Sequence, residues 1–243
     1  MLIRARFTKL GKVRFTSHRD IARIWERALR RAELPVMYSA GFSPRPKLHF
    51  GLALSTGHES VAEYVDIDLE ETASADAVSS ATLLLTACLP EGVDVVALSV
   101  VPQGPSLQEA VTSCSWLIAL PGVSVADLEV ARAEALALDE LLVPTQRKGK
   151  AVVHDVRPGI VAVQPAHDAA SPDLVPMGGA AFIAELATQP RAVRPAEFLL
   201  GLGYDPLAAR VRRLNQWIAH DGDRREPLGA PATSHAHAEL RAT

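Results

Sequence analysis

The sequence predicts an α+β protein made of two tandem ferredoxin-like (βαββαβ) halves, each an antiparallel sheet with helices on one face. Two observations lead to this prediction. The first hundred or so residues alternate between hydrophobic periods of 2 and 3.6, in the order strand, helix, strand, strand, helix, strand. After a linker with Pro and Gly at 102–105, the same plan begins again.

The first half shows each element in its own pattern. Alternation at the N-terminus marks a strand with Ile3, Ala5 and Phe7 on one face. Ser17, with an acid three residues later, predicts a helix start because both side chains can cap free backbone N–H groups. Pro35 ends that helix. The expected strands are 2–8, 47–54, 62–69 and 93–101, and the expected helices are 17–33 and 75–89.

The second half follows the plan less regularly. Ser124 begins a helix, and Pro195 opens a short one that Gly201 and Gly203 stop. The expected strands here are 115–120, 151–156, 160–163, 181–186 and 211–218, and the longer helix is 124–138. The expected domains are an N-terminal ferredoxin-like domain at 1–103, a second at 104–218, and a flexible polar tail at 219–243.

The composition excludes several function classes. Apolar residues make up 48% and charged residues 22% of the chain, as in soluble globular proteins. No apolar run approaches the roughly 18–20 residues of a membrane helix, and the N-terminus shows no signal-peptide pattern. We therefore expect a cytoplasmic protein with no membrane partner. Cys88 and Cys114 are the only cysteines, and we expect two buried free thiols, no metal site and no intrinsic cofactor.

Positive charge is concentrated at the N-terminal end. Residues 1–55 hold twelve Lys and Arg against three acids, a surplus of nine cations, and the net charge of −3 leaves −12 for the remainder. Such a split is typical of a polyanion-binding end, although a solvated basic helix beside an acidic surface of the same protein gives it too. Four arginines of the first helix fall within about 80° of one another, opposite its apolar stripe. They are Arg19, Arg23, Arg27 and Arg30.

The stretch GFSPRPK, residues 41–47, is a second candidate for anion binding. Its two prolines fix the backbone, so the loop can hold cations for a ligand at little cost in entropy. The alternative is that Phe42 plugs the core while the prolines only shape a turn. The candidate binding residues in and before this loop are Tyr38, Phe42, Arg45 and Lys47.

The open face of the sheet is a weaker candidate. Arg4 and Arg6 point away from the helices, but Asp66 and Asp68 do so on the strand that neighbours theirs in a ferredoxin-like sheet. We expect these charges to neutralise one another.

Residues 6–71 resemble the start of the radical SAM-linked protein family, a largely uncharacterised bacterial group. The similar features are Phe15, Ser17-His18, Asp20, the run RALRRA at 27–32, Leu34-Pro35-Val36, Tyr38-Ser39, Gly41-Phe42, Pro44-Arg45-Pro46 and Phe50-Gly51. Sparser landmarks follow at 147–150, 155–158 and 194–195. Members of this family are encoded beside, or fused to, a radical SAM enzyme, sometimes near ribonuclease genes.

The resemblance implies a non-catalytic helper of a radical SAM enzyme, binding an anionic substrate such as RNA or tRNA. A radical SAM enzyme needs three cluster cysteines, so the iron–sulfur cluster and S-adenosylmethionine would belong to the partner. A second basic landmark supports an extended anionic ligand, and a solvated turn explains it equally well. Its residues are Arg147, Lys148, Lys150 and Arg157.

Two alternatives remain open. His18 lies in the first turn of the predicted helix, where Tyr38, Lys47 and His49 can gather near it. By analogy of fold with ferredoxin-like RNA endonucleases of CRISPR systems, it is a weak candidate for metal-independent acid–base cleavage of RNA. The other alternative is a purely protein-binding scaffold.

Overall fold

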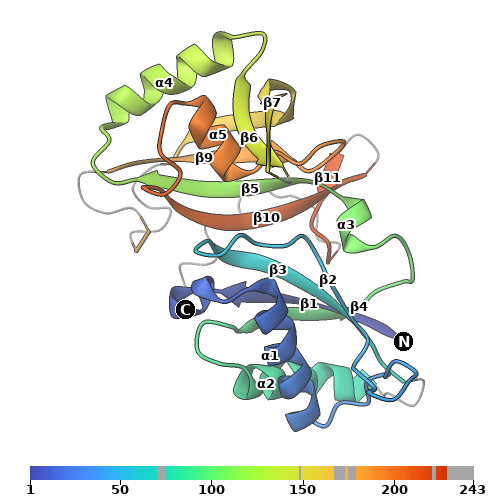
Figure 1. The fold of residues 1–243 in the computed structure, drawn as a ribbon. Helices are drawn as coiled ribbons and strands as arrows, with labels where there is room; N and C mark the ends of the chain where they lie inside the picture. Colours follow the sequence, from blue (N-terminus) through green and yellow to red (C-terminus); the bar gives the residue numbers. More distant parts are fainter. Residues whose placement is uncertain (71–74, 148, 167–172, 175–178, 221–222, 229–243) are drawn as a thin grey trace. The chain divides into compact units, whose positions relative to one another are not determined.

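The computed structural model of the chain describes residues 1–70, 75–147, 149–166, 173–174, 179–220 and 223–228. They form two compact units (Figure 1). Of the described residues, the first unit holds 1–111 and 218–228, and the second holds 112–217. Both contain helices and strands, so the α+β class is confirmed.

The strands of the first unit pair antiparallel to one another. They lie in the order β4-β1-β3, and β2 pairs with β3. The main elements are β1 (Leu2–Lys9), α1 (His18–Arg31), β2 (Leu48–Phe50), β3 (Glu59–Asp68), α2 (Ala75–Cys88) and β4 (Val95–Val100). A 3-10 helix (Gly11–Phe15), the short α3 (Leu107–Ala110) and β11 (Asp223–Arg225), which pairs with the end of β10, complete the unit.

Both long helices of this unit cover the same face of the sheet (Figure 1). α1 begins as the sequence predicts, because the Ser17 hydroxyl accepts a hydrogen bond from the Asp20 backbone N–H. Its buried Trp25 packs edge-on against Phe7 of β1, with ring centroids 5.0 Å apart. The largest fully buried side chains under the helices are Ile3, Phe7, Trp25, Leu29, Ile67, Leu69 and Leu85.

The opposite face carries ion pairs. Arg4 donates two hydrogen bonds to Asp66, as the sequence predicts, and a third to the backbone oxygen of Pro227. Arg6 differs from the prediction: it pairs with Glu226 at 2.7 Å, while Asp68 accepts from His49. The segment after β11 thus completes the charge pairing of the open face. That face offers no free cations at these two positions.

The main strands of the second unit lie in the order β10-β5-β9-β8. A separate hairpin, β6-β7, contains a strand that the sequence did not predict. The elements are β5 (Val111–Leu120), α4 (Val125–Ala137), β6 (Leu142–Arg147), β7 (Lys150–Asp155), a 3-10 helix (Arg157–Gly159), β8 (Ile160–Pro165), β9 (Ala180–Ala187), α5 (Pro195–Gly201) and β10 (Arg210–His220).

The unit boundaries differ from the expected domain boundaries. The first unit continues to residue 111 and takes in residues 218–228, which the sequence assigned largely to a flexible tail. Pro227 is buried there, and Leu228 packs against Tyr64 and Leu107. The last part of the expected tail, 229–243, lies outside the described residues. Within the described ranges, no helix combines the length and apolar character needed to cross a membrane.

Candidate nucleic-acid interface

The solvent face of α1 carries a row of arginines. Ile21, Trp25, Ala28 and Leu29 are buried against the sheet, so the opposite side of the helix faces water. The four arginines that the sequence singled out are all exposed there: Arg19, Arg23, Arg27 and Arg30. We call this set the α1 arginine row.

Most of the row makes no ion pair with any described residue. Arg23 contacts Asp20 at 3.1 Å. A hydrogen bond from Ser17 holds the pKa of the Asp20 carboxyl below its ordinary value, and the charges of Arg23 and Arg19 act in the same direction. Among the described residues, Arg19, Arg27 and Arg30 make no ion pair or side-chain hydrogen bond.

The spacing of the row is unfavourable for the helix itself. Neighbours in it lie three or four positions apart, where like charges destabilise a helix by about 0.2–0.5 kcal/mol a pair. Arg30 in the last turn is favoured by the helix dipole, but Arg19 in the first turn is opposed by it. The neighbouring carboxylate of Asp20 offsets part of this cost, because the charge of Arg19 stabilises its ionised form.

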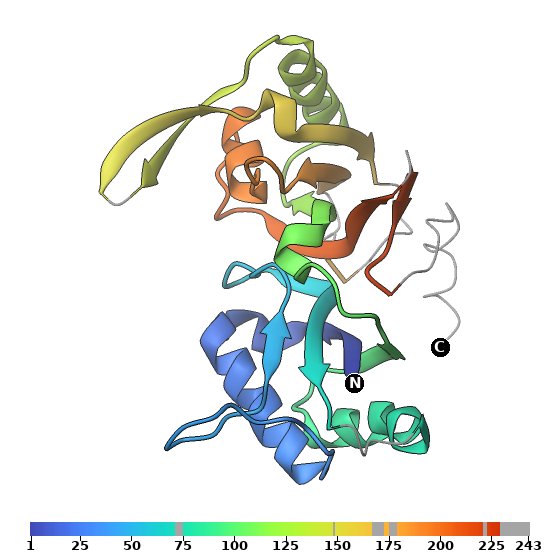
Figure 2. The ribbon, with the colours of Figure 1, turned by 90° about the vertical axis from the view of Figure 1, so that its right-hand side faces the viewer.

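Residues 37–47 form a hairpin that projects beside the C-terminal end of α1 (Figure 2). Tyr38 pairs with Pro46, and the Lys47 N–H donates to the Met37 carbonyl at 2.8 Å. Ser39 and Arg45 exchange two hydrogen bonds, one of them to the serine hydroxyl. These bonds define the 37–47 hairpin as a folded element with a short tip.

The tip exposes an aromatic ring and a cation. The relative exposure of Phe42 is 111%, so the alternative that it plugs the core is wrong. Tyr38 is 42% exposed, Arg45 is exposed and Lys47 is half-buried. Among the described residues, the Arg45 and Lys47 side chains have no ion-pair partner. Gly41 adopts a φ of +127°, a backbone conformation that other residues rarely adopt.

The second basic landmark is only partly described. Lys148 lies outside the described residues, and Arg147 is the last residue of β6, paired with Lys150 of β7. Lys150 is exposed at the start of that strand. Arg157 is engaged within its unit, because it donates to the carbonyls of Leu136 and Leu138 at the end of α4.

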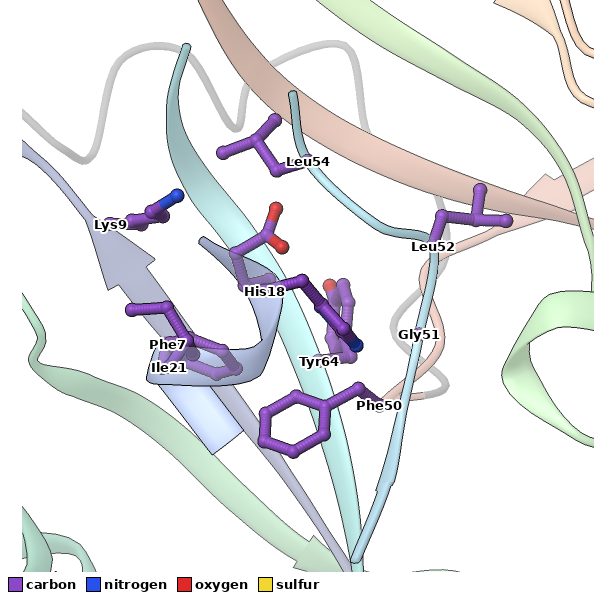
Figure 3. Close-up of a pocket in the computed structure, with 10 residues that line it drawn as sticks. Phe7, Lys9, His18, Ile21, Phe50, Gly51, Leu52, Leu54 and Tyr64 are labelled. Atoms are coloured by element: carbon purple, nitrogen blue, oxygen red, sulfur yellow. The ribbon is translucent and has the colours of Figure 1, made fainter. Parts of the chain in front are cut away.

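His18 borders a small pocket at the first turn of α1 (Figure 3). Its ring lies edge-on to Phe50, with centroids 5.3 Å apart. Buried Lys9, which donates to the Thr16 carbonyl at 2.8 Å, and buried Glu63 also line the pocket. The cavity measures about 10 Å³, which is room for one water molecule at most.

The residues that line this pocket differ from those that the sequence suggested. Tyr38, Lys47 and His49 are not among its lining residues. The sequence analysis missed Lys9 and Glu63, although a signal was present: strand alternation places both on the apolar face, in line with Phe7 and Val65.

A wider groove lies between α1 and the end of α2, with a volume of about 350 Å³. Arg27 of the α1 arginine row lines it, together with Ile24, Arg31 and Leu89. Arg31 donates to the Cys88 carbonyl at 2.6 Å, so its guanidinium is held at the groove wall. Both cysteines are free thiols; Cys114 is buried as predicted, but Cys88 is only half-buried. The described residues contain no cluster of three His, Cys, Asp or Glu side chains arranged for a metal ion.

Comparison with known proteins identifies the family. The model of an uncharacterised protein family conserved in bacteria, DUF2344, matches residues 2–195. The chain belongs to the DUF2344 family. The association with a radical SAM enzyme, which the resemblance of the N-terminal third implies, is not part of that family description.

Other comparisons add little. No curated protein matches the chain. Among solved structures, a chain in the crystal structure of a Cbf5-Nop10-Gar1 complex is 8% identical over 88% of this chain, with a TM-score of 0.45. The match covers 48% of that chain, so this DUF2344 protein spans about half its length. A likeness of this degree does not establish a shared fold.

Proposed function

We propose that this DUF2344 protein is a non-catalytic accessory protein that binds RNA, tRNA included, for a radical SAM enzyme. The α1 arginine row and the 37–47 hairpin form its anion-binding surface. The observation that carries the proposal is that Arg19, Arg27 and Arg30 are exposed on one helix face and make no ion pair with any described residue.

The chemistry of the surface favours phosphate as the ligand. Guanidinium groups bind phosphate oxygens bidentately, and several along one helix can follow a backbone of repeated phosphates. Arg45 and Lys47 extend the cationic surface onto a hairpin in the same unit. Arg157 is not part of the proposed surface, because the end of α4 already occupies its guanidinium.

The enzyme partner would supply the redox chemistry. Two cysteines cannot provide the three thiolates that bind a radical SAM cluster, so the cluster and S-adenosylmethionine would reside on the partner. The accessory protein would then present its RNA to that active site.

Affinity purification of the tagged protein tests this proposal. We expect an iron–sulfur enzyme that cleaves S-adenosylmethionine to co-purify, together with RNA that ribonuclease removes. Purified protein should bind labelled tRNA with an affinity that falls steeply with salt. Retention of a protein partner with no affinity for RNA at low salt would instead support a protein-binding scaffold.

One observation favours a second candidate, metal-independent RNA cleavage. His18 is exposed beside a buried lysine and a buried carboxylate, groups that could assist a general acid or base. Wild-type cleavage of RNA in the presence of a chelator, lost in His18→Gln with RNA affinity retained, would support it. Under the accessory-protein proposal, neither protein cleaves RNA.

We also infer that each unit is a ferredoxin-like half. The order β4-β1-β3-β2 in the first unit has a counterpart in β10-β5-β9-β8 of the second, with a helix after the first and third strands of each set. The β6-β7 hairpin would then be an insertion before the second strand of the second unit.

A further inference from the structure

We propose that the 37–47 hairpin recognises unpaired nucleotides, with Phe42 stacking on a splayed base and Arg45 contacting an adjacent phosphate. This inference rests on the proposed function and deepens it by naming the class of RNA. The ligand would be single-stranded or looped RNA, not a continuous duplex.

Phe42 is placed for a ligand and not for the fold. Its relative exposure of 111% means that its ring is covered by nothing in the described structure. The ring therefore adds nothing to the core and keeps its apolar surface in water. Both of its faces are accessible to a base.

The backbone holds the ring in place before any ligand arrives. The hairpin is closed by the Tyr38–Pro46 bridge and by the two hydrogen bonds between Ser39 and Arg45. Pro44 and the buried Pro46 restrict the returning strand. A ring presented by a stiff element loses less entropy on binding than one on a flexible loop.

The surrounding charges favour nucleic acid over a protein partner. The sequence contains no Asp or Glu from residue 34 to residue 58, whereas Arg45 and Lys47 fall within that range. Asp68 lies beside the base of the hairpin, and its carboxylate accepts from His49. Alternating aromatic and cationic side chains are typical of surfaces that bind single strands, because bases stack on the rings while phosphates contact the cations.

The exposed ring of Phe42 also favours single-stranded over double-stranded RNA. In a continuous helix the base faces are covered by their neighbours, so a phenylalanine can reach only a base that has left the stack. An arginine contacts phosphates in either form. The hairpin would therefore discriminate through Phe42, and the α1 arginine row would bind both forms.

Fluorescence anisotropy with three labelled probes tests this inference: a single-stranded RNA of about 12 nucleotides, the same RNA annealed to its complement, and heparin. Wild type should prefer the single strand to the duplex. Phe42→Ala should weaken single-strand binding by roughly 5- to 150-fold, the range of one base–aromatic stack, and leave heparin binding unchanged. Phe42→Trp should retain affinity, and Leu207→Ala, at a 93% exposed position in the second unit, is the control.

A second readout reports stacking directly. A single strand carrying 2-aminopurine should change in fluorescence on binding wild type, because the probe base leaves the stack of its neighbours, and this change should disappear with Phe42→Ala. The melting temperature of Phe42→Ala should equal that of wild type, because no described residue covers the ring.

Four outcomes would overturn the inference. If Phe42→Ala binds the single strand as wild type does while heparin and RNA still bind, the stacking inference fails and the proposed function stands. If it weakens all three probes equally, the hairpin is not selective. If it loses only a co-purifying protein, Phe42 is a protein anchor. If wild type binds none of the probes, both proposals fail.

Discussion

Arg4 and Asp66 face each other across β1 and β3, joined by hydrogen bonds of 2.6 and 2.8 Å in a buried position. A buried pair of this kind is costly to break, because the remaining charge is left without a partner. Asp66→Asn should therefore lower the free energy of unfolding by about 3–5 kcal/mol, measured by urea denaturation. The double variant Arg4→Met/Asp66→Leu should recover most of that loss.

The Arg4–Asp66 pair also tests whether RNA binds to the open sheet face or to the proposed RNA surface. RNA affinity of Asp66→Asn, measured well below its melting temperature, should match wild type. A strong loss of RNA affinity in a protein shown to be folded would place the binding site on the open face.

Tyr64 supplies a prediction about stability and pH. Its side chain is 1% exposed, and its hydroxyl has no hydrogen-bond partner among the described residues. Leaving a buried hydroxyl unpaired costs about 1–3 kcal/mol, so Tyr64→Phe should stabilise the protein by about 1 kcal/mol near neutral pH. Tyr38→Phe, at an exposed position, should change stability by less than about 0.5 kcal/mol.

The pH dependence follows from the same burial. Burial raises the pKa of Tyr64 far above its ordinary value of 10.0, and the nearby guanidinium of Arg6 opposes this only in part. The stability contribution of the neutral phenol is therefore complete below pH 10 and is lost as the pH rises toward the folded-state pKa. Wild type should lose stability more steeply above pH 10 than Tyr64→Phe, and identical curves would refute the assignment.

The hairpin prolines give a prediction that leaves every charge in place. Pro44→Ala should loosen the returning strand of the 37–47 hairpin, because the proline fixes its own φ and restricts Ser43. The variant should bind tRNA about 2- to 5-fold more weakly, with an unchanged dependence on salt. Ser43→Ala is the matched control. Equal affinities of Pro44→Ala and wild type would show that stiffness of the hairpin does not contribute.

The predictions from the sequence were most accurate where a structural feature depends on residues close together in the chain. The start of α1 depends on Ser17 and Asp20, three residues apart, and the helix begins one residue after that cap. β6 was not predicted, and it contains Pro144, a residue that is rare in strands. Pro is tolerated there because β6 pairs with β7 alone among the described strands.

The site required tertiary information. No local sequence pattern shows whether Phe42 is buried or exposed. In the structure, Phe42 is exposed. The approach of Lys9 and Glu63 to His18 depends on strand pairing and on how α1 packs, which no local sequence pattern specifies. From the sequence, Arg157 was predicted to be available to an anionic ligand. Its actual partners are backbone carbonyls at the end of α4, which no side-chain pattern indicates.

The central claim is that the α1 arginine row contacts phosphates, and the salt dependence of tRNA binding tests it most directly. Anisotropy titrations at several salt concentrations should be made with wild type, Arg19→Gln/Arg27→Gln and the control Arg210→Gln, an exposed cation of the second unit. Each lost phosphate contact should reduce the slope of log affinity against log salt by about 0.7–0.9, so the double variant should lose about 1.5 units while the control keeps the wild-type slope. A double variant that folds normally and binds tRNA with the affinity and slope of wild type would contradict the claim.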